Sequence, residues 1–496
     1  MYSGLPRASK HSRPPRRLAV WTGHDRQKGA LPVSSVIICG GSVVGLATAM
    51  MLARDGHEVT VLERDQAPAA SAGQAWQTWQ RSGVAQFRQP HLLLPRTRQV
   101  LDEELPGLTD DLLAAGCVRF DQLAAILPAV TGWQPEPDDD RLATITGRRP
   151  VVESVLAAAA ASTPGVTVHR GTGVTGLLTG TPVADGIPHV TGVRTAAGAE
   201  LSAGLVIDAT GRQSRLARWL AAIGAPPLTE EAEDSGFVYY TRYFTGPKPP
   251  TLIGPVVAAL GTISLLTLPG DNGTWSVTVF AASADRALRP LRETSRFMAV
   301  VGACPLQAHW LDGEPLTDVL VMAGVLDRYR RFIAGGRPVA TGLLAVGDAW
   351  ACTNPSAGRG ISVGLLHAQQ LRDGVRESAG DPLALAHEFD RRTEAEATPY
   401  YRGQVATDRG RIAEMDALRA GTEPPRPDPA RAGWMAGLTR EPRLLRGLLE
   451  VASCLAHPQE VMARPGFFDL ALSYADEPAP AMPGPGRDVL VSLAAG

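Results

Sequence analysis

The stretch SVIICGGSVVGLATAMMLARDGHEVTVLE, residues 35–63, decides the fold. It starts with a short apolar strand (VIIC), turns through GGSVVG at residues 40–45, continues with helical apolar spacing and ends in a second apolar strand (VTVL). Glu63 closes that second strand. A glycine-rich turn between strand and helix, followed by a strand that ends in an acid, predicts a dinucleotide-binding βαβ unit.

The residue types in the turn suit the binding of a dinucleotide. The first glycine allows a tight turn, the last lets helix and strand pack closely, and the helix N-terminus accepts the pyrophosphate. Gly40, Gly41, Ser42 and Gly45 are therefore candidate cofactor-binding residues, with Ser42 in place of the usual middle glycine. Glu63 is expected to bind the ribose hydroxyls.

A literal G-x-G-x-x-G occurs later, as GTGVTG at residues 171–176. The sequences before and after it, VTVHR and LLTGTPVADG, predict strands and a turn. Phosphate binding needs a helix N-terminus behind the glycines, and no helix is predicted there. We interpret this second motif as a decoy.

The composition excludes several classes of protein. The chain has 496 residues, of which 44% are hydrophobic and 20% charged, and a formal net charge of −2, so two or three domains and no nucleic-acid partner are expected. Its five cysteines lack C-x-x-C spacing, which argues against a metal site or a disulfide framework and favours a reducing cytoplasm.

The basic, Pro-rich residues 1–33 predict a disordered lead-in. Prolines and glycines interrupt the uncharged run at residues 249–270, which predicts buried strands and no integral membrane segment.

The rest of the chain predicts a second, sheet-based domain. The alternating pieces ISLLTLP and TWSVTVFA, joined by GDNG, read as an antiparallel hairpin. A helix is expected at residues 150–161, and an apolar strand at residues 205–207 ends in DATGRQSR. After about residue 376 the chain has helical spacing, broken by the linker TEPPRPDPAR. Another apolar strand ends in GDAWACTNPSAGRG, residues 347–360, before a helix that begins near Ile361.

Three motifs stand in this order along the chain: GGSVVG with Glu63, DATGRQSR, and GDAWACTNPSAGRG. Together they resemble those of FAD-dependent monooxygenases of the para-hydroxybenzoate hydroxylase type, including the actinobacterial tailoring hydroxylases and epoxidases. The likeness runs from about residue 33 to about residue 372. It implies an α/β fold with a discontinuous Rossmann-like FAD-binding domain of the GR2 type, an inserted antiparallel-sheet substrate domain and a C-terminal helical region. The expected ranges are residues 34–75, 149–232 and 338–376 for the FAD-binding domain, 76–148 and 233–337 for the substrate-binding domain, and 377–496 for the helical region.

The resemblance assigns roles in binding non-covalent FAD. Asp348, after Gly347, would bind a ribityl hydroxyl, and the backbone around Pro355, Gly358 and Gly360 would approach the isoalloxazine edge. The helix at Ile361 would point its positive end at the reduced flavin. Further cofactor contacts are implied for a set of residues outside this loop: Glu63 at the adenosine ribose, Arg64 over the adenine, Arg149 at the phosphate or ribityl part, Val174 at the adenine, and Asp208 in the mid-chain motif. Arg148 is the alternative to Arg149.

The mid-chain motif leaves the source of electrons open. Hydroxylases of this type usually carry D-G-x-x-S there, whereas this chain has Asp208-Ala-Thr-Gly211. That form is similar to the epoxidase, reductase and halogenase branches. NAD(P)H is therefore expected either as a transient reductant or through a partner flavin reductase, because no second nucleotide-binding βαβ unit is visible.

Two residues are candidates for catalysis, His91 as an acid or base and Arg359 as a cation beside the flavin. A structural histidine and an outward-pointing arginine are the alternatives. The resemblance implies insertion of one oxygen atom from O2, through a flavin C4a-hydroperoxide, into a hydrophobic, aromatic or alkene-bearing small molecule of secondary metabolism. A dehydrogenase, a reductase or a non-oxygenating flavoprotein is the alternative function. Halogenation is discounted, because the only lysines are Lys10, Lys28 and Lys248 and WQTW lacks the Ile-Pro ending of halogenases.

Overall fold

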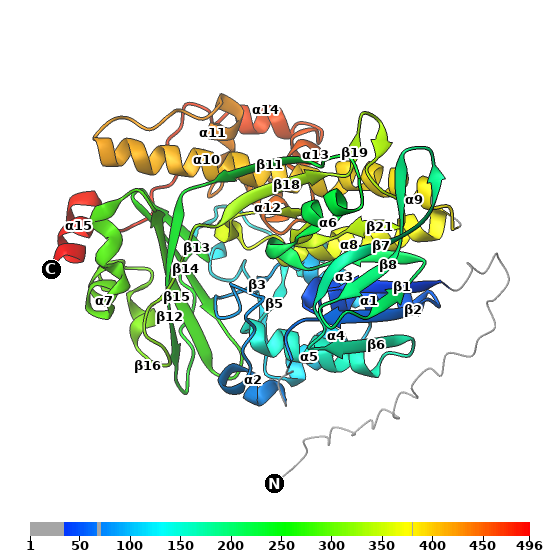
Figure 1. Ribbon diagram of the computed structural model, residues 1–496. Coiled ribbons are helices and arrows are strands. Elements are labelled where there is room, and N and C mark those ends of the chain that lie inside the picture. The colour runs from blue at the N-terminus through cyan, green and yellow to red at the C-terminus, as the bar shows by residue number, and fades with distance from the viewer. Residues whose placement is uncertain (1–33, 67–70, 379) are drawn as a thin grey trace, which may run out of the picture.

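The computed structural model describes residues 34–66, 71–378 and 380–496 of the chain (Figure 1). The lead-in predicted for residues 1–33 lies outside the described residues. A parallel sheet, an antiparallel sheet and a set of C-terminal helices make up the fold, which confirms the predicted fold class.

The predicted βαβ unit forms the centre of a five-stranded parallel sheet. Its strand order is β21-β10-β1-β2-β6, and every neighbouring pair is parallel. The strands come from distant parts of the chain: β1 (Ser35–Cys39), β2 (Glu58–Glu63), β6 (Val166–Arg170), β10 (Leu205–Asp208) and β21 (Leu343–Ala345). Cys39 lies opposite Asp208 in this sheet, so the GGSVVG turn and the mid-chain motif leave it at the same edge.

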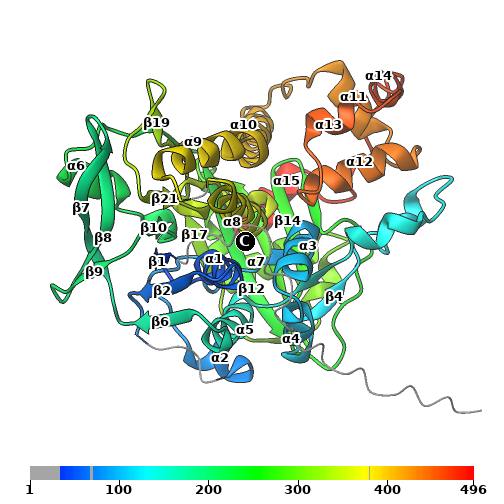
Figure 2. The same cartoon turned by 90° about the vertical axis from the view of Figure 1, so that its right-hand side faces the viewer.

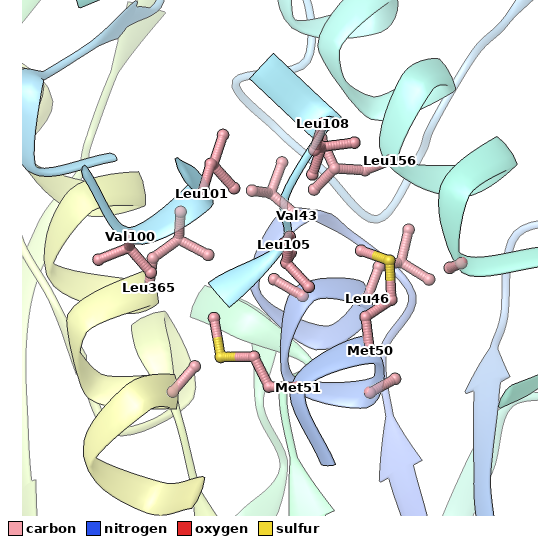
Figure 3. Packing of buried hydrophobic residues seen from close by; sticks show 14 of the residues in the cluster. Val43, Leu46, Met50, Met51, Val100, Leu101, Leu105, Leu108, Leu156 and Leu365 are labelled. Atoms are coloured by element: carbon pink, nitrogen blue, oxygen red, sulfur yellow. The ribbon is translucent and has the colours of Figure 1, made fainter. Parts of the chain in front are cut away.

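Helix α1 (Val43–Arg54) joins β1 to β2 and is buried along most of its length. It packs between α5 (Arg149–Ser162) and α8 (Gly360–Glu377), with Leu46 and Met51 among the packed side chains (Figure 3). A helix that is apolar on nearly all sides belongs inside the protein. The packing therefore fixes the N-terminus of α1, and with it the glycine-rich turn.

The decoy glycines lie among strands, as predicted. Residues 171–173 connect β6 to β7 (Val174–Ala184), which forms an antiparallel sheet with β8 (Ile187–Thr195) and β9 (Glu200–Ser202). The chain therefore continues from GTGVTG as a strand, and no helix N-terminus stands behind these glycines.

The second sheet is antiparallel and has its own hydrophobic core. The predicted hairpin is confirmed, because β14 (Ile263–Pro269) pairs with β15 (Thr274–Ala282). The other strands of this sheet are β12 (Phe237–Thr245), β13 (Val257–Leu260), β16 (Glu314–Pro315) and β17 (Leu320–Ala323). Two helices cover it, α7 (Thr294–Gly302) and α15 (Arg487–Ala495). No helix in the described ranges is long and apolar enough to cross a membrane.

Residues 76–148, which the sequence assigns to the substrate-binding domain, pack on both main sheets, since Phe120 contacts the core of the antiparallel sheet. Helices α3 (Pro95–Glu104) and α4 (Leu108–Ala114) share the core of α1, α5 and α8, through side chains such as Leu101 and Leu108. The small sheet of β3 (Leu92–Leu93), β4 (Val118–Phe120) and β5 (Thr144–Thr146) lies beside them, and α2 (Ala72–Thr78) packs on α5. The apolar helical spacing in this segment predicts that one face of each helix is buried. It does not indicate which of the two cores that face joins.

The region after residue 376 is helical, as predicted, with the expected linker between α10 and α11. The helices are α9 (Pro382–Arg392), α10 (Thr398–Ala420), α11 (Pro429–Ala436), α12 (Pro442–Ala452), α13 (Pro458–Met462) and α14 (Phe467–Leu472). Figure 2 shows α11, α12, α13 and α14 grouped apart from the parallel sheet. A three-stranded sheet of β11 (Thr229–Asp234), β18 (Leu326–Arg331) and β22 (Ala351–Cys352) connects the two main sheets. The remaining short elements are α6 (Leu216–Ala222), β19 (Ile333–Ala334) and β20 (Arg337–Pro338).

Candidate functional site

A cavity of about 310 Å³ lies where the strands of the parallel sheet end. All three motifs contribute to its wall, through Ser42 and Gly45, through residues 209–213, and through Asp348 with the loop that leads into α8. Further parts of the lining are residues 83–86 and 89–91, and alternate residues of a later segment, Met322, Gly324, Leu326 and Arg328. The three motifs, which lie far apart in the sequence, therefore line the same cavity.

The glycines of the first turn are needed for its shape. Gly40 has a φ of +111°, and a Cβ there would lie 2.4 Å from the carbonyl oxygen of Ala209. A Cβ on Gly45 would lie 2.0 Å from the carbonyl oxygen of Gly40. Because neither position has room for a side chain, the turn packs tightly against the mid-chain loop. The start of α1 thereby faces the cavity and offers its free N–H groups to an anion.

Asp348 offers the cavity a carboxylate that accepts no hydrogen bond from the described part of the protein. It follows β21 and lines the cavity, and among the described residues no donor lies within hydrogen-bond distance of its carboxylate. Burial raises the pKa of Asp348, while Arg212 and Arg149 oppose the shift. The Asp348 side chain is half-buried and its carboxylate is open to the cavity, where it is free to accept hydrogen bonds from the hydroxyl groups of a ligand.

The glycines of the loop before α8 bring its backbone to the cavity. Gly358 has a φ of +66°, and Gly360 is the first residue of α8, an 18-residue helix. Pro355, Gly358, Gly360 and Ile361 all line the cavity. The positive end of a long helix therefore faces the cavity beside Asp348.

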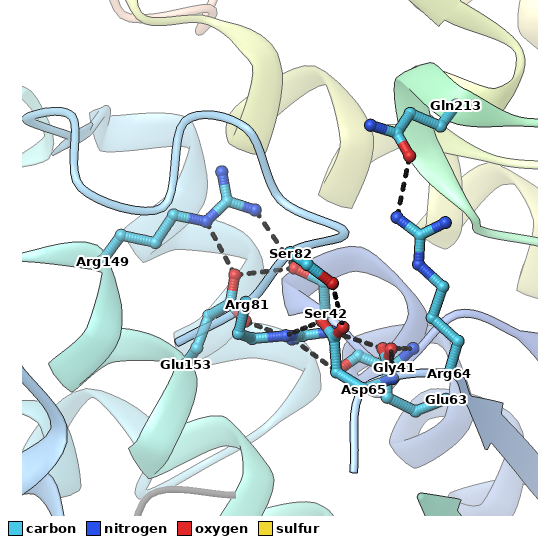
Figure 4. A network of polar contacts seen from close by, with 10 residues as sticks. All are labelled: Gly41, Ser42, Glu63, Arg64, Asp65, Arg81, Ser82, Arg149, Glu153 and Gln213. Atoms are coloured by element: carbon cyan, nitrogen blue, oxygen red, sulfur yellow. Dashed lines mark hydrogen bonds and ion pairs between the residues drawn. The ribbon is translucent and has the colours of Figure 1, made fainter. Parts of the chain in front are cut away.

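Glu63 is held by the protein itself, as Figure 4 shows. Its carboxylate accepts hydrogen bonds from the backbone N–H of Gly41 at 2.8 Å and of Asp65 at 2.9 Å, and it pairs with Arg81. Glu63 is 4% exposed and is not part of the cavity wall. The turn and the end of β2 are thus joined before any ligand binds.

Arg81 is a central residue of the site that the sequence reasoning missed. Its guanidinium contacts Glu63 and Glu153, and it also donates to Asp65 and to the carbonyl oxygen of Gly41, each at 3.1 Å. Burial alone would lower the pKa of Arg81, but Glu153 and Glu63 raise it above the usual value. The available signal was its place at the start of RSGVAQFRQPH, several residues of which line the cavity.

Arg149 rather than Arg148 reaches the cavity. Arg149 donates to Glu153 at 2.7 Å, to the hydroxyl of Ser42 at 3.1 Å and to Nε2 of His91 at 3.1 Å. Arg148 instead pairs with Asp271 of the antiparallel sheet at 2.7 Å. The structure thus separates the two alternatives by their partners.

Comparisons with known proteins agree with this geometry. Residues 35–102 match the family model described as FAD dependent oxidoreductase. PqsL, a probable FAD-dependent monooxygenase from Pseudomonas aeruginosa, is 16% identical, with a TM-score of 0.58 over 78% of this chain and 98% of PqsL. The chain has the fold of an FAD-dependent oxidoreductase.

Other similar proteins widen the range of chemistry found on this fold. The p-nitrophenol 4-monooxygenase PnpA from Pseudomonas putida DLL-E4 is 18% identical, with a TM-score of 0.56 over 86% of this chain and 98% of PnpA. The flavin-dependent brominase Bmp2 is 16% identical, with a TM-score of 0.60 over 89% of this chain and 98% of Bmp2. Protein Rv3254 of Mycobacterium tuberculosis (strain ATCC 25618 / H37Rv) is 28% identical over 395 residues, which cover 75% of this chain and 79% of that protein.

The structure places the two catalytic candidates, His91 and Arg359, at different distances from the cavity wall. His91 lines the cavity, but its Nε2 faces Arg149 and its Nδ1 faces the carbonyl oxygen of Gln89 at 2.8 Å. Burial and then Arg149 lower its pKa to about 3. Both ring nitrogens are engaged by protein groups, as in the alternative of a structural histidine, and a catalytic role for His91 stays a prediction.

Arg359 is not part of the cavity wall, contrary to the expectation of a cation beside the flavin. It lines a neighbouring gap of about 20 Å³, together with Gln404 of α10. This gap shares part of its wall with the cavity, namely Asp348, Thr353 and Gly360. Its Nε is buried without a hydrogen-bond partner in the described part of the chain.

Three residues that were expected to contact the cofactor, Arg64, Val174 and Asp208, are not part of the cavity wall. Arg64 is exposed and donates to Gln213 at 2.8 Å, and Val174 begins β7. Asp208 is fully buried and accepts hydrogen bonds from Thr210 and Ser214, so it shapes the mid-chain turn instead of facing a ligand. Its neighbours, residues 209–213, are the ones that line the cavity.

Proposed function

We propose that the protein binds FAD without a covalent bond and inserts one oxygen atom from O2 into a hydrophobic, aromatic or alkene-bearing small molecule, by hydroxylation or epoxidation. The observation that carries the proposal is the composition of the cavity wall. The three FAD-type motifs form one side, while Met322 at the edge of the antiparallel sheet and Leu326 at the start of β18 form another. A substrate on that second side would stand directly against the cofactor.

The residues present fit FAD. The N-terminus of α1 suits the pyrophosphate, and the unpartnered carboxylate of Asp348 suits a ribityl hydroxyl. The carboxylate of Glu63 already binds Gly41, Asp65 and Arg81 and lies outside the cavity wall, so its contact with the adenosine ribose stays a prediction from the resemblance. The N-terminus of α8 favours negative charge on the reduced isoalloxazine.

FAD supplies the electron transfer and the activation of oxygen, and the chain positions the reactants and excludes water. Apolar side chains that line the cavity, among them Val84, Met322 and Leu326, suit an apolar substrate. Ser42, Arg149 and His91 form a connected polar edge that orients the cofactor side. A place in secondary metabolism is supported by the resemblance to tailoring enzymes.

The lysine positions support oxygenation over halogenation. Halogenases that resemble this fold use a lysine between flavin and substrate. Lys248 is exposed in the segment between β12 and β13 and is not part of the cavity wall. Lys10 and Lys28 lie outside the described residues. The brominase Bmp2 is therefore similar to this chain in fold, while the proposed chemistry is oxygen insertion.

The test uses the purified full chain. Its bound flavin is released and identified by mass, and turnover is then followed with a reductant, isotopically labelled O2 and a panel of aromatic and alkene-bearing compounds. Incorporation of label into product supports the proposal. Product that forms equally well without oxygen and carries no label would favour the dehydrogenase or reductase alternative.

A further inference from the structure

The loop at residues 353–358 has two sides with different roles. Thr353, Pro355 and Gly358 line the cavity. The residues between them, Asn354 and Ser356, bond to buried carboxylates that are not part of the cavity wall. The position of the cavity wall therefore depends on groups behind the loop.

Asp327 of β18 holds the loop at Asn354. Its Oδ1 accepts the backbone N–H of Asn354 at 2.6 Å, and its Oδ2 accepts the hydroxyl of Ser235. Asp327 is fully buried, and its neighbours in the strand, Leu326 and Arg328, line the cavity. Because side chains alternate along a strand, Asp327 lies on the face away from the cavity.

Asp408 of α10 holds the loop at Ser356. Its Oδ1 accepts the hydroxyl of Ser356 at 2.5 Å, and its Oδ2 accepts the side-chain amide of Gln404 at 2.9 Å. Gln404 also donates to the Ser356 hydroxyl at 2.7 Å. Tyr239 of β12 completes the cluster by donating to the side-chain oxygen of Asn354.

These two carboxylates have no salt bridge within the described residues. The charged groups that influence Asp327 are mostly acidic, Asp408 of α10 and Glu233 and Asp234 of β11, and the cation among them is Arg409, whose side chain is exposed and bonds to Glu233. Arg359 is the cation that influences Asp408. Burial raises the pKa of Asp408 and raises that of Asp327 to about 6, to which Asp408 contributes.

Carboxylates that are buried without an ion pair reduce the stability of a protein. A neutral amide of the same shape would accept the same N–H without that penalty. Charged acceptors, however, form stronger hydrogen bonds than neutral ones and hold their donors more firmly. The arrangement is explained if firm placement of this loop matters more than stability.

We propose that Asp327 and Asp408 are positioning residues, which hold Asn354 and Ser356 so that Pro355 and Gly358 stay in place against the bound flavin. The inference rests on the proposed FAD site. It adds two residues, on β18 and α10, that neither touch the cavity nor belong to the three motifs.

The test compares Asp327→Asn and Asp408→Asn with Asp416→Asn. Asp416 lies on the same helix as Asp408, in a surface pair with Arg419, and is the control. FAD is titrated into each apoprotein at about pH 8, and thermal unfolding of the apoprotein is measured in parallel. We expect FAD affinity about five- to tenfold weaker in the first two variants, and unchanged within about twofold in the control.

The stability measurement separates positioning from a general structural role. The folded pKa of Asp327 is raised, so its stabilising contribution is complete at low pH and is lost as the pH rises through about 6. Asp327→Asn should therefore unfold at the same or a higher temperature than the natural protein at about pH 8 while binding FAD more weakly. The affinity gap between the two should narrow toward about pH 5, where the natural carboxyl is protonated.

The outcomes are distinct. Weaker FAD binding with unchanged or increased stability supports the inference. Natural affinity in both Asn variants, or affinity lost only in step with stability, overturns it. Absence of FAD binding in the natural protein would instead overturn the proposed function, and this inference with it.

Discussion

Nη1 of Arg149 lies 3.1 Å from Nε2 of His91. An arginine can only donate, so Nε2 is the acceptor and the ring proton is on Nδ1, which donates to the carbonyl oxygen of Gln89. These two contacts require a neutral His91 that carries its proton on Nδ1, in the wall of the cavity near Ser42. His91 thus acts on Arg149 by holding its guanidinium at the cofactor side of the wall.

A neutral His91 predicts how stability depends on pH. Its folded pKa is lowered to about 3, so its contribution to stability is complete above the ordinary histidine pKa and is lost as the pH falls from about 6.5 toward 3. We expect the unfolding free energy of the natural protein to fall more steeply over that range than that of His91→Gln. Denaturation at a series of pH values measures this, and parallel curves for the two proteins would contradict it.

Removal of Arg81 should destabilise the protein strongly. Arg81→Met would leave the buried carboxylates of Glu63 and Glu153 without this cation, and breaking a buried pair costs about 3–5 kcal/mol. Chemical denaturation gives the value. The matched control is Arg194→Ala, which removes an ion pair with Glu200 in which both side chains are more than half exposed, and it should cost less than about 1 kcal/mol. Equal losses in the two variants would show that the cluster around Arg81 is not a structural centre.

The fold and part of the site could be predicted because they depend on local patterns. The GGSVVG turn, the hairpin and the start of α8 each follow from glycine placement and apolar period within a short stretch. The partners of long side chains could not be predicted in this way. Arg81, Glu153 and Arg149 meet from separate elements, and charged side chains in a sequence do not state which acceptor they reach. For the same reason the sequence did not show that Arg359 lies in the gap toward α10 and not in the cavity wall.

Asp348 provides the direct test of the cofactor site. Asp348→Ala removes the free carboxylate of the cavity, and a hydrogen bond to a charged group is worth roughly 1.5–3 kcal/mol. The expected result is FAD affinity about ten- to a hundredfold weaker, measured by titration of the apoprotein. Asp373→Ala, farther along α8, serves as the control and should bind FAD normally. An unchanged affinity in Asp348→Ala would remove this assignment.

The glycines of the two motifs should respond differently to alanine. Gly40→Ala and Gly45→Ala place a Cβ 2.4 Å and 2.0 Å from backbone oxygens, so both should damage FAD binding and stability. Gly176→Ala meets no atom within 4 Å, and Gly173→Ala meets only ordinary contacts, at 3.7 Å or more. We expect these two variants to bind FAD within about threefold of the natural protein. Titration decides it, and equal losses at both motifs would show that GTGVTG is not a decoy.

The last prediction concerns the source of electrons. The described residues contain one parallel sheet, whose βαβ turn belongs to the proposed FAD site, so NAD(P)H has no separate nucleotide-binding unit in that part of the chain. Arg212 and Arg328 do line the cavity, and they could receive the phosphates of a nucleotide that binds only during reduction. We therefore expect NADH or NADPH alone to bleach the flavin, faster when a substrate occupies the side of Met322 and Leu326. Anaerobic stopped-flow reduction of the natural protein and of Arg328→Ala, with each nucleotide, measures this. The variant should require more nucleotide for half-maximal rate. If neither nucleotide reduces the natural protein until a flavin reductase is added, the enzyme depends on a partner and these arginines serve another ligand.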